Sequence, residues 1–390
     1  MKIKLKKLYL SLLFISFFIH SEDNIVIVIS MDGVRYDYPE YIEGGGFDFI
    51  ARNGSKAASM IPVYQSSTYP GHVTMATGVT PDVHGILHNS FFDKKRGKFS
   101  YSPDASWIES EPVWSIVENS GIKTATFFWV GSESDWNGSK ISYSTAPFDG
   151  KISESRKSKK ILEWLDLEPA KRPRLIMTWW HGSDSISHKT GALNDQVLNQ
   201  LQKQNRELQK LIDSITERNL WKNITLIVVS DHGMSDVSNY INLKEILRDS
   251  SIESRIAAGP AVAHIFLDQL EDSKLAISAL SKNKDLTVWT KKTLPKEFNM
   301  LHKTRTGDII VTTRAPNMLV TRNSSNPPKG MHGYDPKHNK EMEGIFFAVG
   351  NKVSIKNIDT VHHLDITPTI LDLLNLKVPD YMQGKVIHLD

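Results

Sequence analysis

Short apolar runs alternate along the chain with longer amphipathic stretches. Residues 24–30 (Asn-Ile-Val-Ile-Val-Ile-Ser) are continuously apolar between their ends, as a strand covered on both faces requires, and the runs at 175–178 and 224–230 are similar. Strands of this kind that alternate with helices are typical of a mostly parallel sheet covered by helices. The pattern therefore predicts an α/β fold.

Two stretches show the apolar spacing of helices. Residues 194–216 are polar except at 197, 198, 201, 208, 211, 212 and 215, which is the spacing of one helix face. Residues 368–376 predict a second helix, opened by residues 365–367. The segment from about 252 to 320 has the pattern of a smaller inserted α/β unit. We therefore expect one main domain over residues 22–390 that contains this inserted unit.

The first 21 residues have the character of a secretory signal peptide. A basic start, residues 1–7, precedes an apolar run at 8–19. That run is shorter than the roughly 20 apolar residues of a membrane-spanning helix. We therefore expect residues 1–21 to be removed on export, which leaves no membrane span and a secreted or periplasmic protein; a retained N-terminal anchor is the alternative.

Charge and cysteine content narrow the class of protein. The four lysines within residues 1–7 account for more than the whole formal charge of +3, so the remaining chain is almost neutral. This balance gives no support for nucleic-acid binding driven by bulk charge. The chain has no cysteine, so an exported form depends on a large core and not on disulfides. The absence of disulfides favours a bacterial exported protein.

Acidic residues follow three of the predicted strands. Asp32 follows the strand at 24–30, Asp231 follows the strand at 224–230, and Asp184 lies shortly after 175–178. Ligands of open α/β sheets bind beyond the carboxyl ends of the strands. We therefore expect these three carboxylates to converge on one site.

Histidines accompany these acidic residues. His188 lies four residues after Asp184, His232 follows Asp231 directly, and His332 lies in the segment Gly-Met-His-Gly-Tyr. Carboxylate oxygens and imidazole nitrogens are ordinary zinc ligands, about four to an ion, and they also accept manganese or cobalt. Each pair taken alone also fits a surface hydrogen bond or a turn. Their joint occurrence favours a metal site.

Several multi-residue motifs occur in the order that one enzyme family has. They are Val-Ile-Ser-Met-Asp-Gly-Val-Arg at 28–35, Thr-Tyr-Pro-Gly-His at 68–72, Pro-Asp-Val-His-Gly-Ile at 81–86, Phe-Phe-Trp-Val-Gly at 127–131, Ser-Asp-His-Gly-Met at 230–234, His-Gly-Tyr at 332–334 and Asp-Ile-Thr-Pro-Thr-Ile-Leu at 365–371. Through these motifs the chain resembles the nucleotide pyrophosphatase/phosphodiesterase (type I phosphodiesterase) family of the alkaline phosphatase superfamily. The resemblance implies an alkaline-phosphatase-like three-layer α/β/α sandwich.

The resemblance also implies two zinc ions per chain. The implied ligands are Asp184, His188 and His332 for one ion, and Asp32, Asp231, His232 and the Thr68 oxygen for the other. Two ions roughly 4 Å apart suit in-line displacement at phosphorus, because one can activate the attacking oxygen and the other can stabilise the leaving oxygen.

Thr68 is the implied nucleophile. A threonine hydroxyl is weak unless a base or a metal activates it, and taken alone Thr68 also fits a turn or a helix N-cap. By resemblance it attacks phosphorus and forms a phosphothreonine, while the Asn89 amide holds a phosphate oxygen. Tyr69, Trp179 and Tyr143 match positions at which nucleotide-cleaving relatives stack the base, although Trp179 also fits a core position at the end of a strand.

The implied activity is hydrolysis of phosphodiester or pyrophosphate bonds in nucleotides, with release of nucleoside monophosphates. The chain has no cysteine and no arginine directly after Pro70, which argues against a sulfatase-like enzyme. Two alternatives stay open, a choline- or lipid-type phosphodiesterase and a catalytically silent, metal-stabilised binding protein. The sequence assigns no role to the histidines at 72, 84, 88 and 362, which we expect to form supporting hydrogen bonds.

Overall fold

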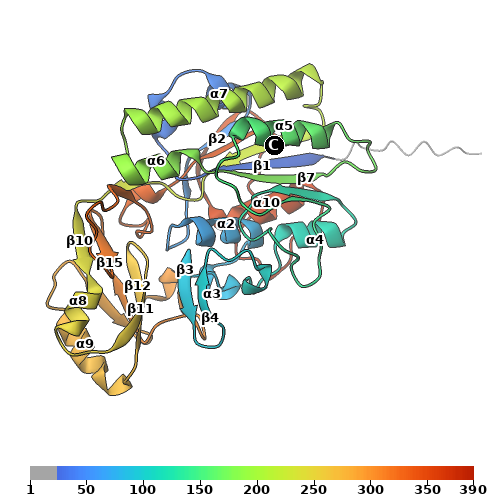
Figure 1. The fold of residues 1–390 in the computed structure, drawn as a ribbon. Helices are drawn as coiled ribbons and strands as arrows, with labels where there is room; N and C mark the ends of the chain where they lie inside the picture. The colour runs from blue at the N-terminus through green and yellow to red at the C-terminus, as the bar shows by residue number, and fades with distance from the viewer. Residues whose placement is uncertain (1–23) are drawn as a thin grey trace, which may run out of the picture.

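The computed structural model describes residues 24–390, so the expected signal peptide at 1–21 lies outside the described residues. An eight-stranded sheet forms the centre of the molecule, in the order β18-β2-β17-β8-β1-β7-β5-β6 (Figure 1). Its strands are β1 (Ile25–Met31), β2 (Ser55–Ile61), β5 (Thr124–Phe127), β6 (Tyr143–Thr145), β7 (Leu175–Trp180), β8 (Ile224–Val229), β17 (Phe346–Gly350) and β18 (Lys356–His362).

This main sheet is mostly parallel, because only β17 runs antiparallel to its two neighbours, β8 and β2. The α/β class is therefore confirmed. The strands expected at 24–30, 175–178 and 224–230 are also confirmed, as β1, β7 and β8.

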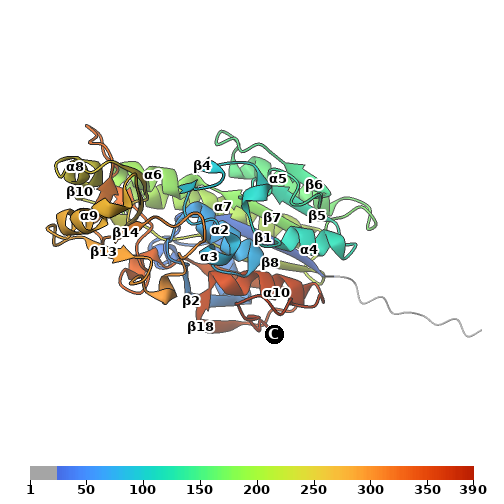
Figure 2. The same ribbon diagram turned by 90° about the horizontal axis from the view of Figure 1, so that it is seen from below.

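Helices cover both faces of the main sheet (Figures 1 and 2). One face is covered by α1 (Gly45–Asn53), α5 (Glu154–Leu165) and α7 (Asp195–Glu217), and the other by α2 (Thr68–Thr77), α4 (Val113–Asn119) and α10 (Ile366–Leu373). Successive β1 side chains point to opposite faces, so Ile27 packs in the first of these cores and Val28 in the second. Both are fully buried, which explains the continuously apolar sequence of this strand.

The two helices expected from sequence are present as α7 and α10. The second begins at Ile366 and ends at Leu373, slightly ahead of the expected 368–376, and it accommodates Pro368 in its first turn, where a missing N–H costs no helical hydrogen bond. Among residues 24–390, no helix has the length and apolar character to cross a membrane.

A second, antiparallel sheet lies beside the main one. Its strands, in the order β11-β12-β14-β13, are β11 (Ser254–Ala258), β12 (Val262–Leu267), β14 (Ile309–Thr312) and β13 (Thr287–Thr290). Helices α8 (Leu243–Arg248) and α9 (Ser273–Leu280) pack on this sheet around a core of its own. We refer to residues 243–312 as the inserted unit; sequence analysis placed such a unit at about 252–320.

The remaining elements are short, and several of them carry residues of the candidate site. They are α3 (Pro81–His84), α6 (Gly182–Thr190), β3 (Ser90–Asp93), β4 (Gly97–Ser100), β9 (Ser235–Asp236), β10 (Asn239–Asn242), β15 (Asn317–Val320), β16 (Gly330–Met331) and the 3-10 helices η1 (Tyr38–Tyr41), η2 (Ala105–Trp107), η3 (Leu270–Asp272), η4 (Lys296–Phe298), η5 (Lys340–Met342) and η6 (His363–Asp365).

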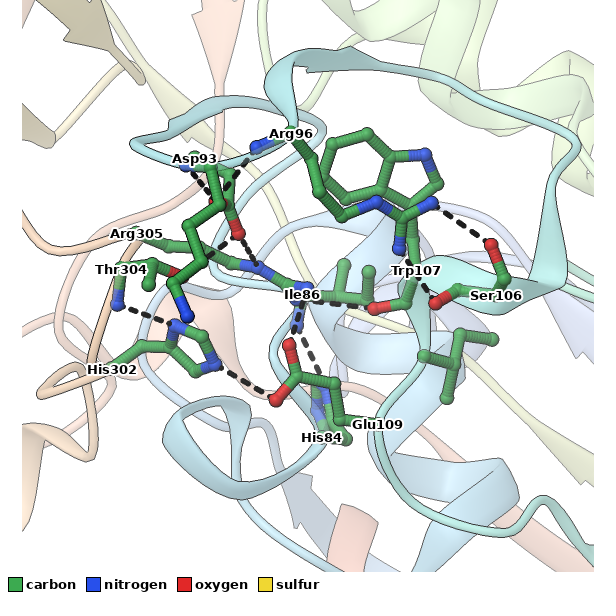
Figure 3. A network of polar contacts seen from close by, with 12 residues as sticks. His84, Ile86, Asp93, Arg96, Ser106, Trp107, Glu109, His302, Thr304 and Arg305 are labelled. Carbon is green, nitrogen blue, oxygen red and sulfur yellow. Dashed lines mark hydrogen bonds and ion pairs between the residues drawn. The ribbon is translucent and has the colours of Figure 1, made fainter.

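A buried ion-pair network joins the inserted unit to the β3–β4 hairpin (Figure 3). Arg305, which is 1% exposed, donates from Nε to Asp93 Oδ2 at 2.9 Å. Its guanidinium also donates to Glu109 and to the carbonyl oxygen of Trp107, and it lies over the ring of Phe91. The hairpin begins directly after a residue that sequence analysis assigns to phosphate binding, so this network helps to fix one wall of the site.

We predict that Arg305→Met lowers the free energy of unfolding by about 3 kcal/mol, because it leaves the buried Asp93 carboxylate without its cation. We expect a loss at the lower end of the destabilisation that breaking a buried ion pair causes, because the backbone N–H groups of Lys95 and Arg96 still donate to Asp93. Equilibrium unfolding in denaturant measures the change.

The matched control is Lys94→Ala, which breaks the solvent-exposed pair between Lys94 and Asp308 at 2.9 Å. Exposed ion pairs contribute less than about 1 kcal/mol, so this variant is expected to unfold almost as the wild type does. Similar small losses for both variants would contradict the structural role of Arg305.

Candidate active site

The carboxyl ends of three neighbouring strands bring acidic residues together. Asp32 follows β1, Asp231 follows β8, and Asp184 lies on α6 just after β7. In the parallel register, Ser30 of β1 pairs with Trp179 of β7 and with Val229 of β8, so the three strands end at nearly the same level. The expected convergence of the three carboxylates is therefore observed.

A glycine permits the close approach of α6 to the end of β1. Gly33 has φ +66°, in the left-handed region that favours glycine. A Cβ atom at this position would lie 3.0 Å from Cβ of Asp184. The Gly33 backbone N–H also donates to Asp231 Oδ1 at 3.1 Å, which fixes one oxygen of that carboxylate.

Asp184, His188 and His332 form the first group of candidate ligands. One side-chain atom from each lies within 4.8 Å of the others. His188 Nε2 is 3.2 Å from Asp184 Oδ2, and His332 Nε2 is 3.8 Å from Asp184 Oδ1. His332 arrives from a distant part of the sequence because β16 lies against α6.

Asp32, Asp184 and His232 form a second group, also within 4.8 Å. His232 Nε2 is 3.4 Å from Asp32 Oδ1, 3.5 Å from Asp231 Oδ2 and 3.3 Å from Thr68 Oγ1. The residues that the resemblance implies for the second ion are thus neighbours. The geometry adds that Asp184 belongs to both groups.

The three histidines share one orientation. The Nδ1 atoms of His188, His232 and His332 lie 2.9, 2.9 and 3.0 Å from backbone carbonyl oxygens. A carbonyl oxygen only accepts, so in the neutral ring Nδ1 carries the hydrogen and Nε2 keeps its lone pair. All three Nε2 atoms lie near the carboxylates, which is the arrangement typical of metal-binding histidines.

The electrostatics of this cluster fit a bound cation. Asp32 Oδ1, Asp184 Oδ1 and Asp231 Oδ2 are buried oxygens without a hydrogen-bond partner. Burial, together with the charges of Asp231 and Asp184, raises the pKa of Asp32 well above its usual range. Burial would also raise the pKa of Asp184, but nearby His188 outweighs it and lowers that pKa to about 2. Divalent cations accept such mixed oxygen and nitrogen ligands, and they would compensate the buried charge.

Thr68 is the first residue of α2, the end at which the helix dipole favours an anion. Its neighbour Tyr69 donates its backbone N–H to Asn89 Oδ1 at 2.8 Å. Because Oδ1 accepts this bond, the amide NH₂ is the group that Asn89 offers to a phosphate oxygen.

A cavity of about 580 Å³ opens over these residues. Its polar part includes Asp32, Thr68, Asn89, Asp184, His188 and His332, and its aromatic part is formed by Tyr69, Tyr101, Phe148 and Trp179. A larger cavity of about 1200 Å³ lies beside the inserted unit, but it includes none of the candidate ligands. The smaller cavity is therefore the candidate active site.

The aromatic side chains form a wall at the mouth of this cavity. The Trp179 ring stacks on Phe148 with centroids 4.6 Å apart, and Tyr69 packs edge-on against Tyr101 at 5.4 Å. Tyr101 and Phe148 are 60% and 39% exposed, so their rings are open to a molecule that enters the cavity. Neither residue could be predicted from the sequence, since each lies in a connecting segment in which no periodicity shows the direction of a side chain.

Tyr143 does not line the cavity, contrary to the base-stacking position implied for it. It lies on β6 at the edge of the main sheet, where its ring packs against the core under α5 and α7 and its hydroxyl donates to the carbonyl oxygen of Lys171 at 2.7 Å. Phe148 lies in the cavity wall instead.

The four histidines without an assigned role form hydrogen bonds around the site and elsewhere. His72 Nδ1 lies 2.8 Å from the Thr68 carbonyl oxygen, which takes its single hydrogen, and 3.3 Å from Asp231 Oδ2. His88 Nε2 lies 3.3 Å from Ser67 Oγ, and His88 lines the cavity. His84 contacts Thr74, and His362 contacts Asp365.

Three kinds of comparison point to one family. A family model described as "Type I phosphodiesterase / nucleotide pyrophosphatase" matches residues 26–335. Venom phosphodiesterase 2 of Crotalus adamanteus is 29% identical over 378 residues, which are 91% of this chain and 46% of the venom protein. An uncharacterized pyrophosphatase/phosphodiesterase of Schizosaccharomyces pombe is 29% identical over 85% of this chain and 72% of its own length. This chain spans about half the length of the venom relatives that it matches.

Solved structures share the fold. Murine ectonucleotide pyrophosphatase / phosphodiesterase 5 superposes with a TM-score of 0.86 at 27% identity, over 93% of this chain and 98% of that one. An inactive variant of the same murine protein, with a threonine replaced by alanine and in complex with AMP, superposes with a TM-score of 0.86 at 26% identity and the same coverage. The alkaline-phosphatase-like α/β fold is thereby confirmed.

Proposed function

The chain belongs to the type I phosphodiesterase / nucleotide pyrophosphatase family, and on this premise we propose that it hydrolyses phosphodiester or pyrophosphate bonds in nucleotides and releases nucleoside monophosphates. The observation that carries the proposal is the position of Thr68, whose Oγ1 lies 3.3 Å from His232 Nε2 at the start of a helix and beside both ligand groups. The inactive threonine variant of the murine relative, in complex with AMP, supports a nucleotide as substrate.

Two divalent cations, which we propose to be zinc, fit the candidate ligands. The first would be held by Asp184, His188 and His332, and the second by Asp32, Asp231 and His232, with the Thr68 oxygen. When bound, the ions would supply positive charge that favours ionisation of the attacking hydroxyl and offsets the charge on the departing oxygen.

The side chains around the phosphorus have separate tasks. Thr68 Oγ1, having lost its proton, forms a bond to phosphorus while the bond to the leaving alcohol or phosphate breaks, which yields a phosphothreonine. Water then attacks the same phosphorus as the bond between phosphorus and Thr68 Oγ1 breaks, and a proton from that water restores the threonine hydroxyl. The Asn89 amide offers N–H groups to the phosphate oxygens in both steps, and the helix dipole at the start of α2 favours their negative charge.

A choline-type phosphodiesterase is the second candidate. The exposed aromatic wall formed by Tyr101, Phe148 and Trp179 offers ring faces that attract a quaternary ammonium group as well as a flat base. A catalytically silent binding protein is less well supported, because such a protein needs no hydroxyl between two groups of metal ligands. Export to the periplasm or the exterior stays a prediction from residues 1–21.

We predict that the purified protein holds two metal ions per chain and that a chelator abolishes its activity toward p-nitrophenyl thymidine monophosphate. The three unpartnered carboxylate oxygens of Asp32, Asp184 and Asp231 require cations to balance their charge. Elemental analysis measures the metal content. Assays before chelation, after chelation and after reloading with zinc, manganese or cobalt measure how activity depends on the metal. Active, chelator-resistant protein with less than one equivalent of transition metal would refute the two-zinc proposal.

Replacing the nucleophile gives a sharper test. We predict that Thr68→Ala lowers kcat by several orders of magnitude while the fold and most metal binding persist, since the change removes the attacking oxygen. The control is Thr77→Ala, which removes a buried hydroxyl from the other end of the same helix, where it donates to the Val73 carbonyl oxygen. Retention of more than about a tenth of wild-type activity by Thr68→Ala, a loss of only about 1.4 kcal/mol, would point to another nucleophile such as Ser66 or Ser67.

Substrate choice is tested at the aromatic wall. If a base stacks against Trp179, then Trp179→Ala should lower kcat/KM for a thymidine ester relative to bis-p-nitrophenyl phosphate by roughly 5-fold to 150-fold, because such stacking contributes about 1 to 3 kcal/mol. The ratio cancels losses that are common to both substrates. An unchanged ratio would exclude stacking on Trp179, and a wild-type preference for p-nitrophenylphosphorylcholine would favour the choline-type enzyme.

A further inference from the structure

A tryptophan of the aromatic wall also contacts the candidate metal centre. Trp179 Nε1 donates a hydrogen bond to Asp32 Oδ2 at 3.0 Å. The other oxygen of the same carboxylate, Oδ1, is buried without a hydrogen-bond partner and lies 3.4 Å from His232 Nε2. One oxygen of Asp32 is therefore fixed, and the other lies among the candidate ligands.

We propose that Trp179 is a positioning residue for metal binding, because its indole N–H holds the Asp32 carboxylate in the orientation that presents Oδ1 to the second cation. The inference rests on the proposed function, since it assumes that the cluster binds metal. Partners that donate to a ligand's second atom orient that ligand, and their loss commonly lowers metal affinity. Base stacking requires only a flat ring, whereas this role requires the N–H group.

A buried lysine fixes the backbone of Trp179 through a hydrogen bond. Lys157 on α5 has no exposed surface, and its Nζ donates to the Trp179 carbonyl oxygen at 2.7 Å. The same ammonium lies 3.5 Å from Nδ1 of His181, the residue before α6. A buried ammonium group is unfavourable unless polar atoms surround it, and here these atoms belong to Trp179, near the end of β7, and to His181, directly after β7.

The indole ring is confined as well. Phe148 stacks on one of its faces at 4.6 Å, and His72 packs against it edge-on at 5.6 Å. The backbone and the ring of Trp179 are thus both fixed by neighbours, so its N–H has little freedom to leave Asp32. A carboxylate held in this way loses less rotational freedom when it binds a cation.

The test is the zinc affinity of Trp179→Phe, measured on metal-free full-length protein by competition with a chromophoric chelator. Phenylalanine keeps a flat ring in this partly buried position but removes the N–H donor. We expect affinity for one of two zinc ions to fall by about 10-fold to 100-fold, with little change at the other.

The adjacent tryptophan offers a matched control. Trp180 is buried on the same strand, and its indole nitrogen has no hydrogen-bond partner. Trp180→Phe therefore also removes one indole N–H, but it should leave the affinity for both zinc ions close to that of the wild type.

The outcomes separate this inference from the proposed function. Unchanged zinc affinity in folded Trp179→Phe would overturn the positioning role and leave the proposed hydrolase intact. Wild-type protein that binds no zinc would overturn both. If Trp179→Phe fails to fold, Lys157→Met provides the second test, because it removes the hold on the Trp179 carbonyl oxygen; it should weaken zinc binding at the same ion, and unchanged affinity would again overturn the role.

Discussion

The burial of three carboxylates at one edge of the main sheet is the constraint on which the rest of the site depends. Asp32, Asp184 and Asp231 repel one another at close range, and each keeps a buried oxygen without a hydrogen-bond partner. Such an arrangement is unfavourable unless cations or protons compensate it. Backbone carbonyl oxygens engage the Nδ1 atoms of the surrounding histidines, so their Nε2 atoms are directed at the same space, which is the arrangement of metal-binding histidines.

Much of the framework follows from sequence pattern, because parallel buried strands have a simple signature. The apolar runs fixed the places of β1, β7 and β8, and their carboxyl ends then predicted that Asp32, Asp184 and Asp231 would meet. The pattern could not place His332, which directly follows β16, a short strand paired with β9. Only the resemblance of the segment around His332 to a family motif suggested that this histidine lies beside Asp184.

Other features depend on tertiary contacts that no periodicity reveals. Phe148 and Tyr143 lie five residues apart, and both are aromatic, yet β6 pairing holds Tyr143 at the sheet edge while the following loop brings Phe148 over Trp179. The shared position of Asp184 in both ligand groups is likewise a matter of distances. The bond of Arg305 to Asp93 joins segments more than 200 residues apart.

The contact between Trp179 and Asp32 links two properties that are usually considered separately. The indole ring forms part of the wall that a substrate would touch, and its N–H donates a hydrogen bond to the carboxylate that would bind a cation. A substitution chosen to change substrate preference at this position therefore also changes the orientation of a candidate metal ligand. Phe148 contributes to the same wall without touching a carboxylate, so substrate preference can vary there at a smaller cost to metal binding. The wall thus has one part, Trp179, that contacts the metal centre directly, and another part, Phe148, that acts on it only through Trp179.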